Sequence, residues 1–177
     1  MTVPLVALLA GALLSVLLGI YGAKHEPTSQ ALTTLGFGNL IEMKVWLAVA
    51  TGVLGLLQLG GALWMYGRLG AAAPAWVGPG HRACGYLALL VSVPVAYSCL
   101  WSLGFQSSNA RVRTHSLVGC AFYGAFVVKV AGVRSKTAPR WFLPLAGSAL
   151  FTLLVAVVVA SAGWYLTQSG LPSSSPY

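Results

Sequence analysis

The sequence predicts an all-α integral membrane protein with five membrane-spanning helices. Hydrophobic residues make up 58% of its 177 residues and charged residues only 7%, whereas a soluble domain carries about 25% charged residues. The apolar residues gather in five runs, each near the ~20 residues that a spanning helix needs. The formal charge of +8 is spread over basic residues that stand singly between these runs. This spacing argues against a nucleic-acid-binding protein, which gathers its basic residues in a patch on a polar surface.

The first predicted helix runs from about Val3 to Ile20. A signal peptide is the alternative, but the run lacks a basic n-region and is long enough to span. We therefore expect a retained helix or signal anchor over residues 1–22. The other four helices are expected over about Ile41–Tyr66, Cys84–Leu103, His115–Val133 and Trp141–Leu166.

These four helices are expected to form one bundle over residues 41–166, because no linker separates them. The stretch "AAAPAWVGPG" (71–80) is rich in proline and glycine and is predicted to be a loop. Thr114 is predicted to cap the helix that begins at His115, since a threonine hydroxyl can accept a hydrogen bond from a free N–H group there. The polar tail, residues 167–177, is expected to be disordered.

The basic residues predict the orientation of the five helices. With five spans the two termini lie on opposite sides. The side of the N-terminus receives six basic residues: Arg68, Arg82, Lys129, Arg134, Lys136 and Arg140. The other side receives four: Lys24, Lys44, Arg111 and Arg113. Because short cytoplasmic loops carry an excess of Lys and Arg, we expect a cytoplasmic N-terminus and an external C-terminus in a bacterial plasma membrane.

Two of the three histidines share a pattern, since each precedes a glycine by four residues: His81 with Gly85, and His115 with Gly119. Residues at this spacing lie on one helix face, and glycine there leaves room for a flat macrocycle. An ionisable side chain at membrane depth is a candidate functional residue. The pattern therefore suits axial ligands of b-type haem. In the plainer alternative, the histidines lie in the headgroup region and the glycines are helix contacts.

Other side chains near each histidine are candidate haem contacts. Arg82 lies beside His81, and Arg111 and Arg113 precede His115; arginine can pair with haem propionates. On the face of His115, Phe122 and Phe126 could pack against a macrocycle.

The two histidines begin consecutive, antiparallel helices, so they should be separated by most of the ~30 Å hydrocarbon core and cannot bind one iron. The candidate second ligand for His81 is Met65, and those for His115 are His25 and Met43. His/Met ligation of haem is known, whereas the alternative for the methionines is core filling.

The three cysteines, Cys84, Cys99 and Cys120, form no CxxC or CxxCH motif. This argues against a zinc site and against covalent c-type haem attachment. They are read as small apolar side chains, with a Cys99–Cys120 disulfide left open.

The stretches "HRACGYLALLVSVPVAYSCLWSLGF" and "RVRTHSLVGCAFYGAFVVKV" resemble the cytochrome b561-like membrane proteins, and more closely a small uncharacterised family of actinobacterial membrane proteins. The resemblance covers roughly residues 41–166. It implies a four-helix bundle that holds b-type haem between histidines, with His81 and His115 as candidate ligands. Where the family places a partner for His115, this chain has Tyr97, Ser98 and Cys99.

The expected function is a membrane-embedded haem b electron-transfer subunit that works with a partner redox enzyme or with quinone. The alternative is a cofactor-free accessory subunit of a larger membrane complex. The chain shows no nucleophile, carboxylate pair or nucleotide-binding loop, so a stand-alone enzyme is the less favoured reading.

Overall fold

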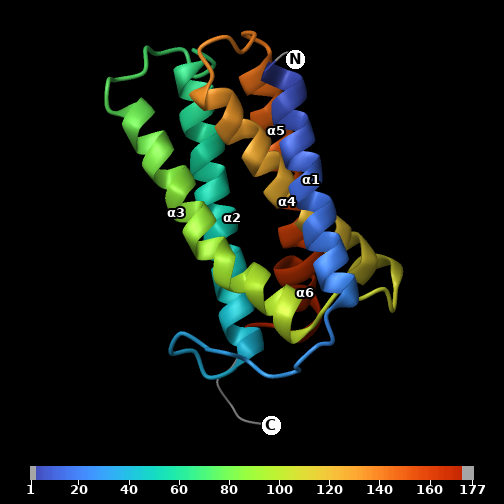
Figure 1. Cartoon of the computed structure of the whole chain (residues 1–177). Helices are drawn as coiled ribbons and strands as arrows, with labels where there is room; N and C mark the ends of the chain where they lie inside the picture. Colours follow the sequence, from blue (N-terminus) through green and yellow to red (C-terminus); the bar gives the residue numbers. More distant parts are fainter. Residues whose placement is uncertain (1–2, 173–177) are drawn as a thin grey trace. The chain divides into compact units, whose positions relative to one another are not determined.

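The computed structural model describes residues 3–172, and every regular element in that range is a helix (Figure 1). The elements are α1 (Val3–Lys24), α2 (Leu40–Met65), α3 (Val77–Tyr97), η1 (Ser98–Ser102), α4 (Ala110–Arg134), α5 (Phe142–Val158), η2 (Val159–Gly163) and α6 (Trp164–Ser169). The segments η1 and η2 are π-helical and continue α3 and α5. The predicted all-α class is confirmed.

Within residues 3–172, five segments are long and apolar enough to cross a membrane: Val3–Lys24, Leu40–Met65, Val77–Ser102, Ala110–Arg134 and Phe142–Ser169. Large apolar side chains such as Leu9, Leu13 and Leu90 are more than half exposed, which fits contact with lipid tails. The five predicted spans are therefore confirmed by length and composition. A b561-like arrangement of the last four helices stays a prediction.

Several predicted helix boundaries were wrong. The third span begins at Val77 rather than Cys84, so the last four residues of the predicted loop 71–80 are helical and His81 lies in the second turn. The C-terminal helix extends to Ser169, so residues 167–169 are helical rather than part of a disordered tail. Residues 173–177 of that tail lie outside the described residues.

The fourth helix begins at Ala110, five residues before the predicted start. Asn109 has extended backbone dihedrals, and its side-chain oxygen accepts a hydrogen bond of 2.9 Å from the Val112 N–H. This is N-capping geometry. Thr114 therefore lies inside the helix and does not cap it, which corrects the prediction and places His115 in the second turn.

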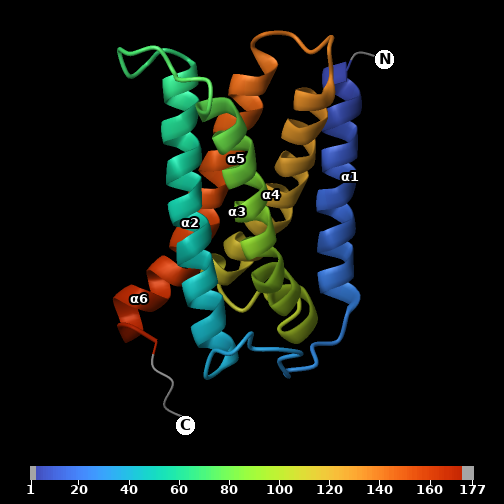
Figure 2. The ribbon, with the colours of Figure 1, turned by 90° about the vertical axis from the view of Figure 1, so that its left-hand side faces the viewer.

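The helices divide by their contacts into two units, each of which is described by itself. The first unit comprises residues 1–32 and 98–161, described here from residue 3. Within it α4 packs against both α1 and α5 (Figure 2). The first helix is thus grouped with α4 and α5. The physical reason is a close helix contact that hydropathy does not reveal.

That contact joins Gly11 of α1 to Gly124 of α4. A Cβ atom built at Gly124 would overlap the Gly11 carbonyl oxygen and Ser15 Oγ, and one built at Gly11 would meet the Gly124 oxygen in turn. Small residues let helix backbones approach closely in lipid, where van der Waals contact replaces the hydrophobic effect as the driving force. Both glycines are therefore required by packing.

The second unit comprises residues 33–97 and 162–177, described here up to residue 172. Its helices α2 and α3 pack together. Val45 and Ala48 of α2 form a buried cluster with Ala162 of η2, against which Tyr165 and Leu166 of α6 pack.

Candidate functional site

One end of the first unit is built from the loop after α1 and the segment η1. In η1 the Leu103 N–H donates to the Ser98 carbonyl, five residues back, which is the π-helical bond. The last carbonyls of η1 accept hydrogen bonds from the loop: Trp101 O from the Thr28 N–H at 3.3 Å, and Ser102 O from the Ser29 N–H at 3.0 Å. These bonds fix η1, and with it Cys99 and Trp101, against the end of α1.

A glycine turn completes this end of the unit. Gly104 has a φ of 66°, a conformation that glycine adopts without strain, and a Cβ built there would lie 2.8 Å from Pro27 Cγ. The next N–H group, of Phe105, donates to Gly22 O at 2.8 Å. The loop 103–109 is thereby held beside α1 before α4 begins.

The imidazole of His25 lies between two aromatic rings. Its centroid is 5.1 Å from that of Tyr21 and 4.5 Å from that of Trp101, and both pairs are stacked. Its Nε2 donates to Trp101 O at 3.2 Å, because a carbonyl oxygen can only accept. His25 therefore has a structural partner, and it would have to give up this hydrogen bond to bind a metal through Nε2.

The imidazole of His115 has weaker partners. Its Nε2 lies 4.0 Å from Cys99 Sγ, and a thiol is only a weak hydrogen-bonding group. Its Nδ1 is buried and has no hydrogen-bond partner within residues 3–172. A buried polar atom without a hydrogen bond costs free energy, so this ring has coordination capacity that the described protein atoms leave unused.

The face of α4 that carries His115 is turned towards α5 and η2. One turn before His115, Arg111 Nη1 donates to Ala160 O at 2.7 Å. One turn after it, a Cβ built at Gly119 would meet only Val157 Cγ2, at 3.8 Å. That is an ordinary contact, so helix packing does not require glycine at this position. Phe122 lies on the same face and is buried.

Arg113 does not share this face. At about 100° per residue, two positions separate Arg113 from His115 by about 200° around the helix. The two arginines that were predicted as propionate partners thus lie on different faces of α4. Of the pair, Arg111 lies on the His115 face and is already bonded to a carbonyl.

The surroundings of His81, in the second unit, are filled by protein atoms. A Cβ built at Gly61 of α2 would lie 3.2 Å from His81 Nδ1, so the ring packs against that glycine. The Gln58 side-chain amide donates to His81 O, and a Cβ built at Gly85 would lie 3.4 Å from Gln58 Oε1. The space expected for a macrocycle over Gly85 is therefore occupied by Gln58.

The remaining predicted site residues also belong to the second unit. Met43 is 1% exposed, near the start of α2, which matches core filling, whereas Met65 at the end of α2 is 41% exposed. Arg82 is exposed.

Cys99 is the residue that the sequence reasoning missed as a partner of His115. No disulfide forms among the described cysteines. Cys99 faces His115, and Cys120 lies about 140° around α4 from that histidine, which corrects the alternative of a Cys99–Cys120 bond. The available signal was the position of Cys99, at the end of the third span, where the b561-like pattern places a partner ligand.

The model of one family, described as "Family of unknown function (DUF6529)", matches residues 3–173, nearly the whole chain. No curated protein and no solved structure matches the sequence.

Proposed function

Because the chain belongs to this family of unknown function, we propose its function from its own residues: a membrane-embedded electron-transfer subunit that carries b-type haem on His115. A partner redox enzyme or quinone would exchange electrons with it.

The observation that carries the proposal is the imidazole of His115, with Nδ1 buried and unpartnered within residues 3–172 and Nε2 beside the thiol of Cys99. An ionisable ring at membrane depth is costly unless it is paired or used. Ligation of a metal through Nε2 would use the ring in its neutral form, in place of the weak contact with the thiol.

The donor set favours haem over a bare metal ion. A bare transition metal such as zinc takes three or four protein ligands, and among the described residues no three His, Cys, Asp or Glu side chains form such a group. Haem iron needs only one or two protein ligands. The Cys99 thiol, whose Sγ lies 4.0 Å from His115 Nε2, is of the type that can serve as a haem ligand.

Cys99 is therefore the second ligand that we propose, in place of His25 and Met43, which the sequence suggests. Bound haem would supply a one-electron carrier in the apolar part of the membrane. His115 would hold it from α4, and Gly119 would add no side chain below the ring, where Val157 of α5 is the neighbour. Phe122 would exclude water from that face.

The proposal places the protein in a bacterial plasma membrane. The sequence-based orientation supports an N-terminus in the cytoplasm and a C-terminus outside, because six basic residues fall on the cytoplasmic side and four on the other. On this orientation the end of α4 that carries His115 faces outwards, where an external redox protein or a quinone headgroup would meet it.

A cofactor-free accessory subunit is the second candidate function. The observation that favours it is the filled space at His81, where Gln58 occupies the position over Gly85. One of the two expected haem positions is thus already closed by protein.

Haem content decides between the two candidates. We expect the purified full-length protein to contain haem by the pyridine haemochrome assay, His115→Ala to lose it, and His81→Ala to keep it. Loss of haem from His81→Ala with retention in His115→Ala would place the site in the other unit. Absence of haem from the unmodified protein, produced with ample haem supply, would leave the accessory subunit.

A further inference from the structure

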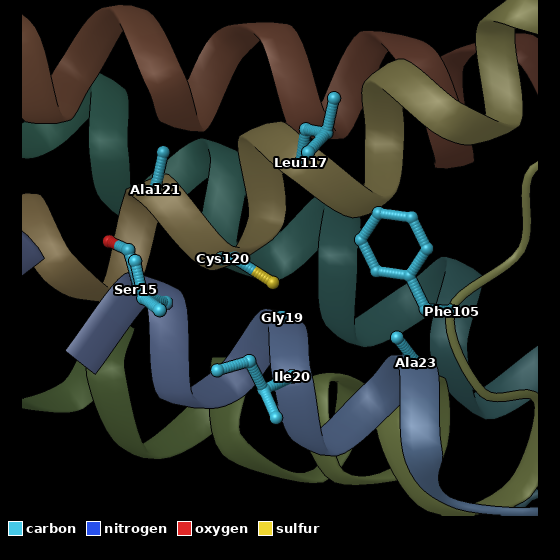
Figure 3. Close-up of a pocket in the computed structure, with 9 residues that line it drawn as sticks. Ser15, Gly19, Ile20, Ala23, Phe105, Leu117, Cys120 and Ala121 are labelled. Carbon is cyan, nitrogen blue, oxygen red and sulfur yellow. The ribbon is translucent and has the colours of Figure 1, made fainter. Parts of the chain in front are cut away.

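An open groove of about 410 Å³ runs between α1 and α4 in the first unit. Gly19 and Ile20 of α1 line it together with Leu117, Cys120 and Ala121 of α4. Figure 3 shows the Cys120 thiol pointing towards Gly19, with Phe105 beside Ala23 at one end and Ser15 at the other. The groove lies on the opposite side of α4 from His115, since Leu117 is about 200° from that residue around the helix. It is therefore separate from the site proposed above.

The groove lies beyond the glycine contact between the two helices. At Gly124 an added Cβ would overlap Gly11 and Ser15, whereas at Gly19, two turns along α1 from Gly11, an added Cβ would meet nothing within 4 Å. The small side chains that allow close packing at one point thus leave unfilled space beyond it.

The lining selects an apolar occupant. Ser15 carries the one hydroxyl among the lining residues, and that hydroxyl donates to Gly11 O at 3.1 Å. From Ser15 to Ala23 the groove spans eight residues of helix, or about 12 Å at 1.5 Å per residue. This is close to half of the ~30 Å hydrocarbon core, the depth that one acyl chain of a single leaflet fills.

A basic residue from each helix lies at the mouth of the groove. Lys24 follows the lining residue Ile20 by one turn on α1, and Arg113 precedes the lining residue Leu117 by one turn on α4. Residues four apart share a helix face, so both continue the lining towards the membrane surface, where both side chains are exposed. Against these two cations stands the nearby carboxylate of Glu26, exposed in the loop after α1, so the three groups together carry a net positive charge.

We propose that this groove binds an anionic phospholipid, with one acyl chain between α1 and α4 and the phosphate held by Lys24 and Arg113. Basic residues at the surface ends of transmembrane helices attract anionic headgroups. A zwitterionic lipid would fill the groove equally well but would gain less from the two cations. The two cations thus select an anionic lipid headgroup, and the apolar groove holds the acyl chain of the lipid.

The test is lipid binding to the detergent-purified full-length protein by native mass spectrometry, comparing phosphatidylglycerol with phosphatidylcholine of identical chains. We expect phosphatidylglycerol to bind more tightly by on the order of tenfold, and Lys24→Gln with Arg113→Gln to abolish this preference. Gly19→Leu fills open space without a Cβ clash and should weaken both lipids while the protein stays folded by circular dichroism.

The matched control is Lys136→Gln with Arg140→Gln, which removes the same charge at the other end of α4, and it should keep the preference. Equal binding of the two lipids by the unmodified protein would overturn the proposal. So would equal loss in the control pair, which would indicate a general charge effect. Displacement of phosphatidylglycerol by a long-chain quinone, independent of Lys24 and Arg113, would assign the groove to an isoprenoid tail instead.

Discussion

The imidazole Nε2 of His115 lies 4.0 Å from the Sγ of Cys99, although the two residues stand on different spans. Cys99 lies in the π-helical end of the third span, and His115 lies in the second turn of the fourth. The hydrogen bonds from Thr28 and Ser29 to η1 hold the cysteine in place. The account of function depends on this pair.

Removal of the Cys99 thiol should change the haem spectrum without removing the haem. In Cys99→Ala we expect a shifted Soret band, because iron held by His115 alone would lose its second protein ligand. Cys120→Ala is the matched control, since that thiol lies on another face of α4, and its spectrum should equal that of the unmodified protein. An unchanged spectrum in Cys99→Ala would exclude the thiol as a ligand.

The start of α4 depends on Asn109 and not on Thr114. Asn109→Ala removes the hydrogen bond from the Val112 N–H and should lower the free energy of unfolding by about 1 kcal/mol. Thr114→Ala should change it by less than about 0.5 kcal/mol. Unfolding of the detergent-solubilised protein by SDS titration measures both. A larger loss from Thr114→Ala would restore the original prediction that the helix begins near His115.

The contact between α1 and α4 should be sensitive to a single added side chain. Gly124→Val would force the Val side chain into Gly11 and Ser15, and such overpacking costs about 1–3 kcal/mol. Gly19→Ala, on the open part of α1, should be close to neutral. Equal stability of the two variants in the same SDS titration would mean that the helices do not meet at these glycines.

The spans were predictable from sequence because membrane helices are marked by long apolar runs, and the second helix matched within a residue at each end. The start of α4 was missed because its first turn, "ARVRT", is polar. A spanning helix can begin in the polar interface, where hydropathy gives no signal. Asn109 was the available signal, since asparagine is among the best N-cap residues.

The candidate site was only half predictable. The sequence suggested His115 as a ligand because histidine is rare in this chain and because of the residues around it. It did not suggest Cys99, because the direction of the Cys99 side chain depends on the π-helical turn that contains it. A π-helical bond closes over five residues instead of four and so rotates the following side chains relative to an α-helix. The position of the Gln58 side chain beside Gly85 was not predicted for a related reason. The glycine pattern shows where a side chain is missing, but it does not show which neighbouring side chain fills the space.

The predicted orientation can be checked by labelling single cysteines. In a background with the three native cysteines replaced by alanine, Ser108→Cys should react with a membrane-impermeant maleimide from outside intact cells. Thr137→Cys should react only after the cells are opened. The reverse pattern would invert the orientation and turn the His115 end of α4 towards the cytoplasm.

The most direct test of the central claim is the optical spectrum of the purified, full-length protein, recorded oxidised and then reduced with dithionite. The account predicts a Soret band and, on reduction, a sharp α band, both lost in His115→Ala. A folded protein with neither band, produced in cells supplied with haem precursor, would contradict it.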